Sequence, residues 1–254
     1  MRTAVRCLTI IAAVVLLSLL LTPSSHARQT SKADQTLLEL ANHDRAAAGL
    51  APLKWDPALA KAAHQHALRM ARANQLSHQF PGEPSMQDRA RQAGARFSVI
   101  AENVAQGPTP GSIHTQWMNS PPHRANLLDP ELTAVGISVV QSGNTLFAVE
   151  DFSTPVPTLS LESQEQQVAS QLDAQGLHVS ASSPDARKTC ELDRGWAGPR
   201  PAAVLRYETA DLTELPSEVT QRVASGKYQS ASVGACDAPD VSDFTHFRVA
   251  ILLY

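Results

Sequence analysis

Apolar residues in the first part of the chain recur at helical intervals. Over residues 34–48 they fall three and four positions apart and are followed by Gly49, which predicts a helix that ends at that glycine. A second apolar stripe predicts a longer helix from Pro57 to about Asn74. Asp56 is suited to cap this helix, and proline is favoured at its first position.

The next stretch changes from helical to strand periodicity. "TAVGISVV" and "TLFAVEDF" are predicted to be two antiparallel strands, because "QSGN" between them is typical of a hairpin turn. "FSVIAENVAQG", residues 97–107, is interpreted as an extended piece that turns into a loop. Short helices are predicted over 87–93, over 111–119 and from Pro121, the last of them capped by Ser120.

A stretch rich in proline, serine and threonine, "STPVPTLS", separates a second pattern from the first. Behind it, a helix over 163–176 carries a capping box from Ser163 to Gln166. Further expected elements are a strand over 202–209, a helix from Pro216 and strands over 228–236 and 244–254. The predicted division is a first domain, 34–153, a linker, 154–160, and a small α+β domain of unknown type, 161–254.

The first residues have the layout of a secretory signal peptide. Arg2 and Arg6 precede the apolar run "CLTIIAAVVLLSLLL", and "TPSSHA" offers a small-x-small cleavage site that ends at Ala27. A membrane anchor is the structural alternative, but the run is short for a bilayer span. Cys7 lies too early for lipid attachment. We expect residues 1–27 to be removed and the product to be secreted, extracellular or periplasmic, without stable membrane insertion.

Charge and cysteine content narrow the partners and the compartment. The full chain has a formal net charge of −3, and residues 1–27 hold two arginines and no acidic residue, so the remainder carries −5. This argues against nucleic acid as a partner, because phosphate binding requires a basic surface. Cys190 and Cys236 then remain, and two cysteines in an exported chain predict one disulfide. Two free buried thiols are the alternative.

Histidines are the main candidates for chemistry. His64 and His66 are two positions apart on a helix and therefore face different sides, and the chain has no H-E-x-x-H or G-x-S-x-G motif. No catalytic residue is assigned. His78 follows the long helix, and His123 lies in the first turn of a short one, where the helix dipole disfavours a charged imidazole. With Glu102 they would suit Zn²⁺ if they converge. The alternative is that His123 bonds nearby backbone.

Several motifs then occur in a familiar order: "LANHDRAAAGLAPLKWDPALAKAAHQHALRMA", "LSH", "AENVAQG", "WMNSPPHRANLLDPELTAVGISVV" and "FAVEDFS". This order resembles the CAP superfamily, the cysteine-rich secretory proteins, antigen 5 and pathogenesis-related proteins, in its bacterial SCP-like extracellular form. The resemblance covers roughly residues 34–153 and not 155–254. It implies an α-β-α sandwich with a central cleft, followed here by a small α+β domain that contains the disulfide.

The resemblance also implies which residues line the cleft. Eukaryotic members hold two histidines and two acidic residues there, and some of them bind Zn²⁺. His78 matches the first cavity histidine and Glu102 the glutamate of the family's G/A-E-N motif. His123 matches the second histidine, since it lies thirteen residues before Gly136. The implied ligand-binding residues are His78, Glu102 and His123, and the implied metal ligands are the two histidines.

The second cavity acid is where this chain departs from the family pattern. That acid normally follows a tryptophan by three positions, but here Trp117 leads to Ser120. Glu150 or Asp151 on the last strand of the domain is a candidate replacement. Without the second acid, tight metal binding is less secure, and a metal-free pair of histidines with a glutamate is then a fair interpretation.

Three functions are compatible with this sequence. The first is a secreted binding module whose cleft holds a small ligand, a lipid or a cell-envelope component, with or without Zn²⁺. The second is a metal-assisted hydrolase that uses the same cleft, with Glu102 as general base. The third is a scaffold whose C-terminal domain docks a protein partner. We favour the first and expect that the chain is not an enzyme.

Overall fold

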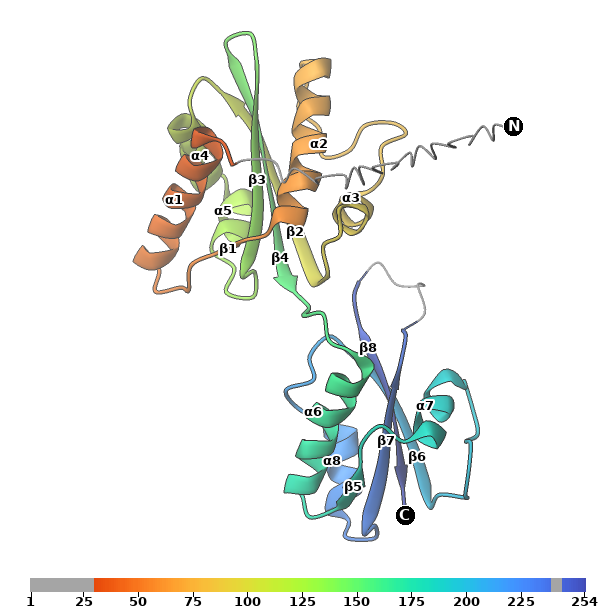
Figure 1. The fold of residues 1–254 in the computed structure, drawn as a ribbon. Coiled ribbons are helices and arrows are strands. Elements are labelled where there is room, and N and C mark those ends of the chain that lie inside the picture. Colours follow the sequence, from red (N-terminus) through yellow and green to blue (C-terminus); the bar gives the residue numbers. More distant parts are fainter. Residues whose placement is uncertain (1–29, 239–243) are drawn as a thin grey trace, which may run out of the picture.

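The computed structural model describes residues 30–238 and 244–254 and contains two α+β units joined by a short connection (Figure 1). The predicted signal peptide, residues 1–27 with Cys7, lies outside the described residues. Within the described ranges, no helix combines the length and apolar character needed to span a membrane.

The first unit is built on a four-stranded sheet with strand order β1-β3-β4-β2. Its strands are β1 (Lys54–Trp55), β2 (Phe97–Gly107), β3 (Ala134–Ser142) and β4 (Thr145–Pro155). Only the pairing of β1 with β3 is parallel. Its helices are α1 (Lys32–Ala47), α2 (Pro57–Ala73), α3 (Met86–Ala93), α4 (Pro110–Asn119) and α5 (Pro121–Leu127).

Both faces of this sheet are covered, as the predicted α-β-α sandwich requires. Side chains on β4 alternate between the two layers because successive residues of a strand point to opposite faces. Phe147 and Val149 pack with Met70 and its neighbours on α2, whereas Ala148 and Phe152 pack with α1, α4 and α5. Figure 1 shows α2 and α3 on one side of the sheet and α1, α4 and α5 on the other.

Gly136 sets the distance between α2 and the sheet. A Cβ atom at this position of β3 would lie 2.0 Å from the backbone nitrogen of Ala60 and 2.2 Å from the carbonyl carbon of Leu59. The first turn of α2 therefore rests directly on the backbone of β3. Asp56 holds this turn in place, since its Oδ1 accepts from the N–H groups of Ala58 and Leu59, as the predicted cap should.

The expected loop within residues 97–107 is wrong. The whole segment is strand β2, and its pairing with β4 runs from Phe97 opposite Pro155 to Gly107 opposite Leu146. Glu102 consequently stands in the middle of a strand. The sequence pattern concealed this strand because several residues toward both faces are buried, so polar and apolar positions do not alternate cleanly.

The second unit repeats the sheet-and-helix plan on a smaller scale, with strand order β5-β7-β8-β6. Its strands are β5 (His178–Ser180), β6 (Ala203–Thr209), β7 (Ser230–Cys236) and β8 (Phe247–Leu253). Its helices are α6 (Leu161–Ala174), α7 (Pro184–Glu191) and α8 (Ser217–Ala224). The sequence did not predict α7 or β5. The cap predicted for α6 is also wrong, because Ser160 caps the helix and accepts from the N–H of Ser163.

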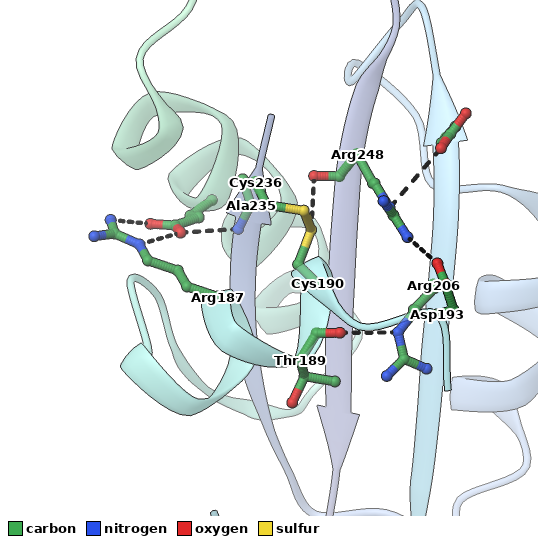
Figure 2. The surroundings of a disulfide bond; sticks show 10 residues. Arg187, Thr189, Cys190, Asp193, Arg206, Ala235, Cys236 and Arg248 are labelled. Carbon is green, nitrogen blue, oxygen red and sulfur yellow. Dashed lines mark hydrogen bonds and ion pairs between the residues drawn. A yellow bond between two sulfur atoms is a disulfide. The ribbon is translucent and has the colours of Figure 1, made fainter. Parts of the chain in front are cut away.

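The predicted disulfide is confirmed. It joins Cys190 of α7 to Cys236 at the end of β7 (Figure 2). An ion pair also joins α7 to α6. Arg187 of α7 donates from Nε and Nη2 to the two carboxylate oxygens of Glu165, each at 2.6 Å. Burial alone would raise the pKa of Glu165, but the hydrogen bonds from Arg187 and from the N–H of Ala235 hold that pKa below its ordinary value.

Replacing both cysteines with alanine should destabilise the second unit by about 4 kcal/mol, which is the loop-entropy expectation for this sequence separation of 46 residues. The measurement is urea unfolding monitored by circular dichroism. The variant is compared with the wild-type chain in its oxidised and reduced forms. A reduced wild type as stable as the oxidised chain would contradict this expectation.

The two units contact each other through the start of β2. The N–H of Thr245 donates to the carbonyl of Phe97 at 2.8 Å, and the N–H of Val156 donates to the carbonyl of Arg96 at 2.9 Å. The ring of Phe244 meets that of Phe97 edge-on, with 6.1 Å between centroids. Val156 in turn belongs to the apolar core of the second unit, so the connection is held from both sides.

Candidate functional site

The structure brings the three sequence-predicted site residues together. Glu102 lies in β2, His78 follows α2, and His123 lies in the first turn of α5. The Nδ1 atom of His78 is 2.8 Å from Oε1 of Glu102. The carbonyl oxygen of His123 accepts a hydrogen bond from Nδ2 of Asn103, the residue that follows Glu102 in β2.

Glu102 is the buried anchor of the group, with a side chain only 3% exposed. Its Oε2 accepts a short hydrogen bond from Nη2 of Arg89, a side chain that is itself 3% exposed. The ring of His66 lies 3.9 Å from the same oxygen. A buried carboxylate is costly unless it is paired, and Arg89 is the cationic partner of Glu102 in this position.

His78 combines a fixed ring orientation with an accessible edge. Its side chain is 62% exposed, while Glu102 occupies its Nδ1. The hydrogen bond with Glu102 raises the pKa of His78 above the ordinary value, although partial burial and Arg89 oppose that shift. The remaining ring nitrogen, Nε2, is therefore the atom that can meet an external ligand.

His123 is held by the cap residue of its own helix. Its Nδ1 lies 2.8 Å from the hydroxyl oxygen of Ser120, and that serine makes no side-chain cap bond to α5. Burial lowers the pKa of His123, and the neighbouring charge of His78 lowers it further. The direction agrees with the neutral imidazole expected at a helix start. The ring's contact is a side chain, however, and not the backbone contact considered as the alternative.

Two asparagines join α5, which carries His123, to β2, which carries Glu102. The Nδ2 of Asn103 donates to the carbonyl of His123 at 3.1 Å, and the Nδ2 of Asn126 donates to Oδ1 of Asn103 at 2.9 Å. The same Asn126 atom lies 3.4 Å from the carbonyl oxygen of Glu102. Sequence reasoning missed both residues, and the only available signal was that Asn103 directly follows Glu102.

The candidate replacements for the second acid lie on different faces of the sheet. Asp151 stands opposite Glu102 in the pairing of β4 with β2, and Glu150 stands opposite Asn103. Burial raises the pKa of Glu150 to about 8, and burial and the charge of Glu102 raise the pKa of Asp151. Both are almost inaccessible, so neither acid reaches the surface.

A buried pair, His66 and Glu83, lies next to the residues of the candidate site. The Nδ1 of His66 lies 2.8 Å from Oε1 of Glu83, and its Nε2 lies 2.7 Å from the carbonyl oxygen of Ser77. The two histidines of α2 therefore differ in environment. His66 is fully buried, whereas His64 is part-buried, with its Nδ1 3.1 Å from the hydroxyl oxygen of Ser138. These contacts fix the segment between α2 and α3 that carries His78.

The residues present do not fit a bound Zn²⁺ ion. Both oxygens of Glu102 already have partners, and Asp151 is buried behind it. Across residues 30–238 and 244–254, no three or more His, Cys, Asp and Glu side chains are arranged to hold a metal. Cavities of about 910, 510 and 340 Å³ occur in the described part of the chain, and His78, Glu102 and His123 line none of them.

Comparison with known proteins shows a family match within the first unit. The profile of the cysteine-rich secretory protein family, CAP, matches residues 38–152. In Bacillus subtilis (strain 168), the uncharacterized protein YkwD is 35% identical over 124 residues, 48% of each chain, and the uncharacterized membrane protein YlbC is 33% identical over 107 residues, 42% of this chain and 31% of that protein. The chain thus spans about half or less of the length of these relatives.

Solved structures of similar proteins match about half of the chain. An extracellular protein containing an SCP domain from Bacillus anthracis str. Ames is 29% identical over 48% of this chain and 40% of its own, with a TM-score of 0.45. An outer surface protein from Borrelia burgdorferi is 20% identical over 50% of this chain and 96% of its own, with a TM-score of 0.47. Residues 38–152 of this chain match the cysteine-rich secretory protein (CAP) family.

Proposed function

We propose that this chain is an exported binding module that holds a small ligand against His78, Glu102 and His123. The observation that carries the proposal is the exposed imidazole of His78, which is fixed through Nδ1 to a buried carboxylate. Such an arrangement presents one ring nitrogen in a defined direction and limits the side-chain entropy lost on binding. The expected ligand is a lipid or a cell-envelope component.

The two imidazoles differ in the charge that they can offer. The pKa of His78 is raised and that of His123 is lowered, so His78 is the more readily protonated of the two. A protonated His78 donates to an oxyanion, and a neutral His123 donates or accepts according to its tautomer. We therefore expect a ligand with a phosphate or carboxylate group next to a hydroxyl or amide.

The test is a nuclear magnetic resonance titration of the full chain that follows the ring signals of both histidines. One probe is a short-chain phosphatidylglycerol below its micelle concentration, and the other is a soluble peptidoglycan fragment. We expect one probe to shift both sets of ring signals saturably, and His78→Ala and His123→Ala each to weaken that binding about tenfold. His43→Ala, an exposed histidine of α1, is the matched control and should bind like the wild type.

Absence of saturable shifts with both probes would overturn the proposal, as would unchanged binding by the His78→Ala/His123→Ala double variant. The metal-assisted hydrolase is the second candidate, and it is less well supported because both oxygens of its general base are engaged. Calorimetric titration with Zn²⁺ separates the two candidates. Saturable Zn²⁺ binding that is lost in the double variant would favour the hydrolase.

The domain division belongs to the same proposal. We propose that residues 34–153 and 161–254 are separate domains joined by 154–160, since β4 ends at Pro155 and α6 begins at Leu161. The C-terminal domain would dock a protein partner or contribute to ligand binding.

A further inference from the structure

The second unit has the same topology as the first. Its elements α6, β5, α7, β6, α8, β7 and β8 follow the chain order of α1, β1, α2, β2, α4, β3 and β4. In both sheets the first two strands of the strand order are parallel and the remaining pairings are antiparallel. Figure 1 shows α7 on one side of its sheet and α6 and α8 on the other, as α2 lies opposite α1 and α4. Residues of the two units can therefore be matched by their place in the fold.

A close contact between a helix and a strand recurs at the same place. In the first unit, the first turn of α2 rests on Gly136 of β3, where an added Cβ would lie 2.0 Å from the backbone nitrogen of Ala60. In the second unit, a Cβ on Gly234 of β7 would lie 2.1 Å from the backbone nitrogen of Arg187, in the first turn of α7. Gly234 thus corresponds to Gly136, and α7 corresponds to α2.

The cap residues of the two helices confirm this match. Asp56 caps α2, and its N–H donates to the carbonyl of Val135 at 2.8 Å. Ser183 caps α7, and its N–H donates to the carbonyl of Val233 at 3.1 Å. Each cap residue is followed by a proline, and each accepting valine directly precedes the matched glycine.

The register of the sheets then identifies the residue of the second unit that corresponds to Glu102. In the first unit, Gly136 and Glu102 pair with the same residue of β4. In the second unit, Gly234 and Arg206 pair with the same residue of β8. Arg206 of β6 therefore takes the place of Glu102 of β2, with the opposite charge.

Glu102 and Arg206 both contact the segment that follows the matched helix. Glu102 contacts His78, which follows α2. Arg206 donates from Nη2 to the carbonyl of Gly195, which follows α7, and from Nε to the carbonyl of Thr189 at 2.9 Å (Figure 2). The loop of residues 192–200 in the second unit thus has the same position as the segment that carries His78 in the first.

This loop presents a tryptophan from a fixed backbone. The carbonyl of Gly195 is held by Arg206, and the N–H of Ala197 donates to Oγ1 of the fully buried Thr189 at 2.9 Å. Trp196 lies between these two contacts and is 43% exposed, one of the most exposed large apolar side chains in the described part of the chain. Because the backbone on both sides of Trp196 is fixed, little conformational entropy is lost when the loop meets a ligand.

Exposed charges of both signs surround Trp196 in the sequence. Arg194 and Arg200 are exposed, and the side chain of Asp193 is 97% exposed. An anionic membrane surface would attract the two arginines but repel Asp193. An acidic glycan suits the whole set, because its carboxylates pair with guanidinium groups, its hydroxyls donate to a carboxylate, and the apolar face of a sugar ring packs on an indole ring.

We propose that the loop of residues 192–200 is a second binding surface, and that it takes an acidic glycan. Trp196 packs against a sugar ring, Arg194 and Arg200 hold carboxylates, and Asp193 accepts from hydroxyl groups. The surface lies in the second unit at the place of the histidine site in the first, and it does not depend on the function proposed for that site.

The experiment is calorimetric titration of the full chain at low ionic strength with two acidic oligosaccharides, hexagalacturonate and a hyaluronate hexasaccharide. We expect saturable binding of at least one of them. The methyl ester of the bound oligosaccharide should bind about tenfold more weakly or worse, because it lacks the charge that pairs with the arginines. Absence of saturable binding by both acidic oligosaccharides would overturn the proposal, and so would equal affinity for the ester.

Variants test the individual side chains. Trp196→Ala and the Arg194→Gln/Arg200→Gln pair should each weaken binding about tenfold, since tryptophan and arginine dominate binding energy at contact surfaces. The arginine pair should also lose the preference for the acid over its ester. Arg222→Gln, which changes an exposed arginine of α8, is the matched control and should bind like the wild type.

Two further results would contradict this assignment. One is wild-type affinity in Trp196→Ala, with folding confirmed by circular dichroism. The other is binding to phosphatidylglycerol vesicles without binding to either oligosaccharide, which would identify a membrane surface as the partner. The His78→Ala/His123→Ala variant should bind the oligosaccharides like the wild type, and a loss there would place their binding at the histidine site instead.

Discussion

Replacing Arg89 with methionine should destabilise the first unit by about 3–5 kcal/mol, the usual cost of removing one partner from a buried ion pair. Arg89 is 3% exposed and donates to Glu102, and its Nη1 lies 3.3 Å from the carbonyl oxygens of His78 and Pro84. Without it, the buried carboxyl of Glu102 loses the guanidinium that pairs with it. Urea unfolding gives the change in free energy.

A double variant tests whether the destabilisation by Arg89→Met is caused by the loss of charge pairing. Glu102→Gln in the Arg89→Met background removes the uncompensated carboxylate, so the pair should be less destabilised than the sum of the single variants. The pKa of His78 gives a second readout. It should rise further in Arg89→Met, because Arg89 lowers it, and fall back in Glu102→Gln. Additive stability losses together with an unmoved His78 pKa would show that Arg89 acts only by packing.

Gly136→Ala should abolish the folded first unit or destabilise it by more than about 4 kcal/mol, in the range reserved for severe core disruption. The new Cβ would lie 2.0 Å from the backbone nitrogen of Ala60, so the first turn of α2 would have to move off the sheet. No flexible side-chain end is available to yield, because the nearest two atoms belong to backbone. Circular dichroism and limited proteolysis would report the loss.

The matched control is Gly111→Ala in α4. Gly111 has no heavy atom within 4 Å of an added Cβ and lies in a helix, where alanine is preferred to glycine. This variant should be neutral or slightly more stable than the wild type. If Gly136→Ala unfolds at the same temperature as Gly111→Ala, the close approach of α2 to β3 does not constrain the fold.

Elements with strong local signals could be predicted from the sequence. Asp56 and the proline after it marked the start of α2, and the hairpin of β3 and β4 was marked by its turn. Elements that depend on distant partners could not be predicted. α7 carries few apolar residues and is held by the disulfide and by Arg187, and β2 gains its strand character from β4.

The candidate site also contains residues that could be predicted from the sequence and residues that could not. His78, Glu102 and His123 could be proposed because their motifs resemble those of a known family. In the structure His78 contacts Glu102, and His123 is bonded to the neighbouring Asn103. Arg89 and Asn126 could not, because their roles arise only when α3 and α5 pack against β2. Short contacts between residues many positions apart leave no periodic trace in a sequence.

The backbone pairing of Thr245 with Phe97 has a consequence for the order of events during synthesis. The sheet of the first unit is complete once β4 has emerged, so this unit can fold while the residues that follow are still being delivered. Its docking to the second unit must wait for Thr245, which lies beyond β7. During that interval the edge of β2 near Phe97 is uncovered, and this is when a chaperone or a second nascent chain could reach it.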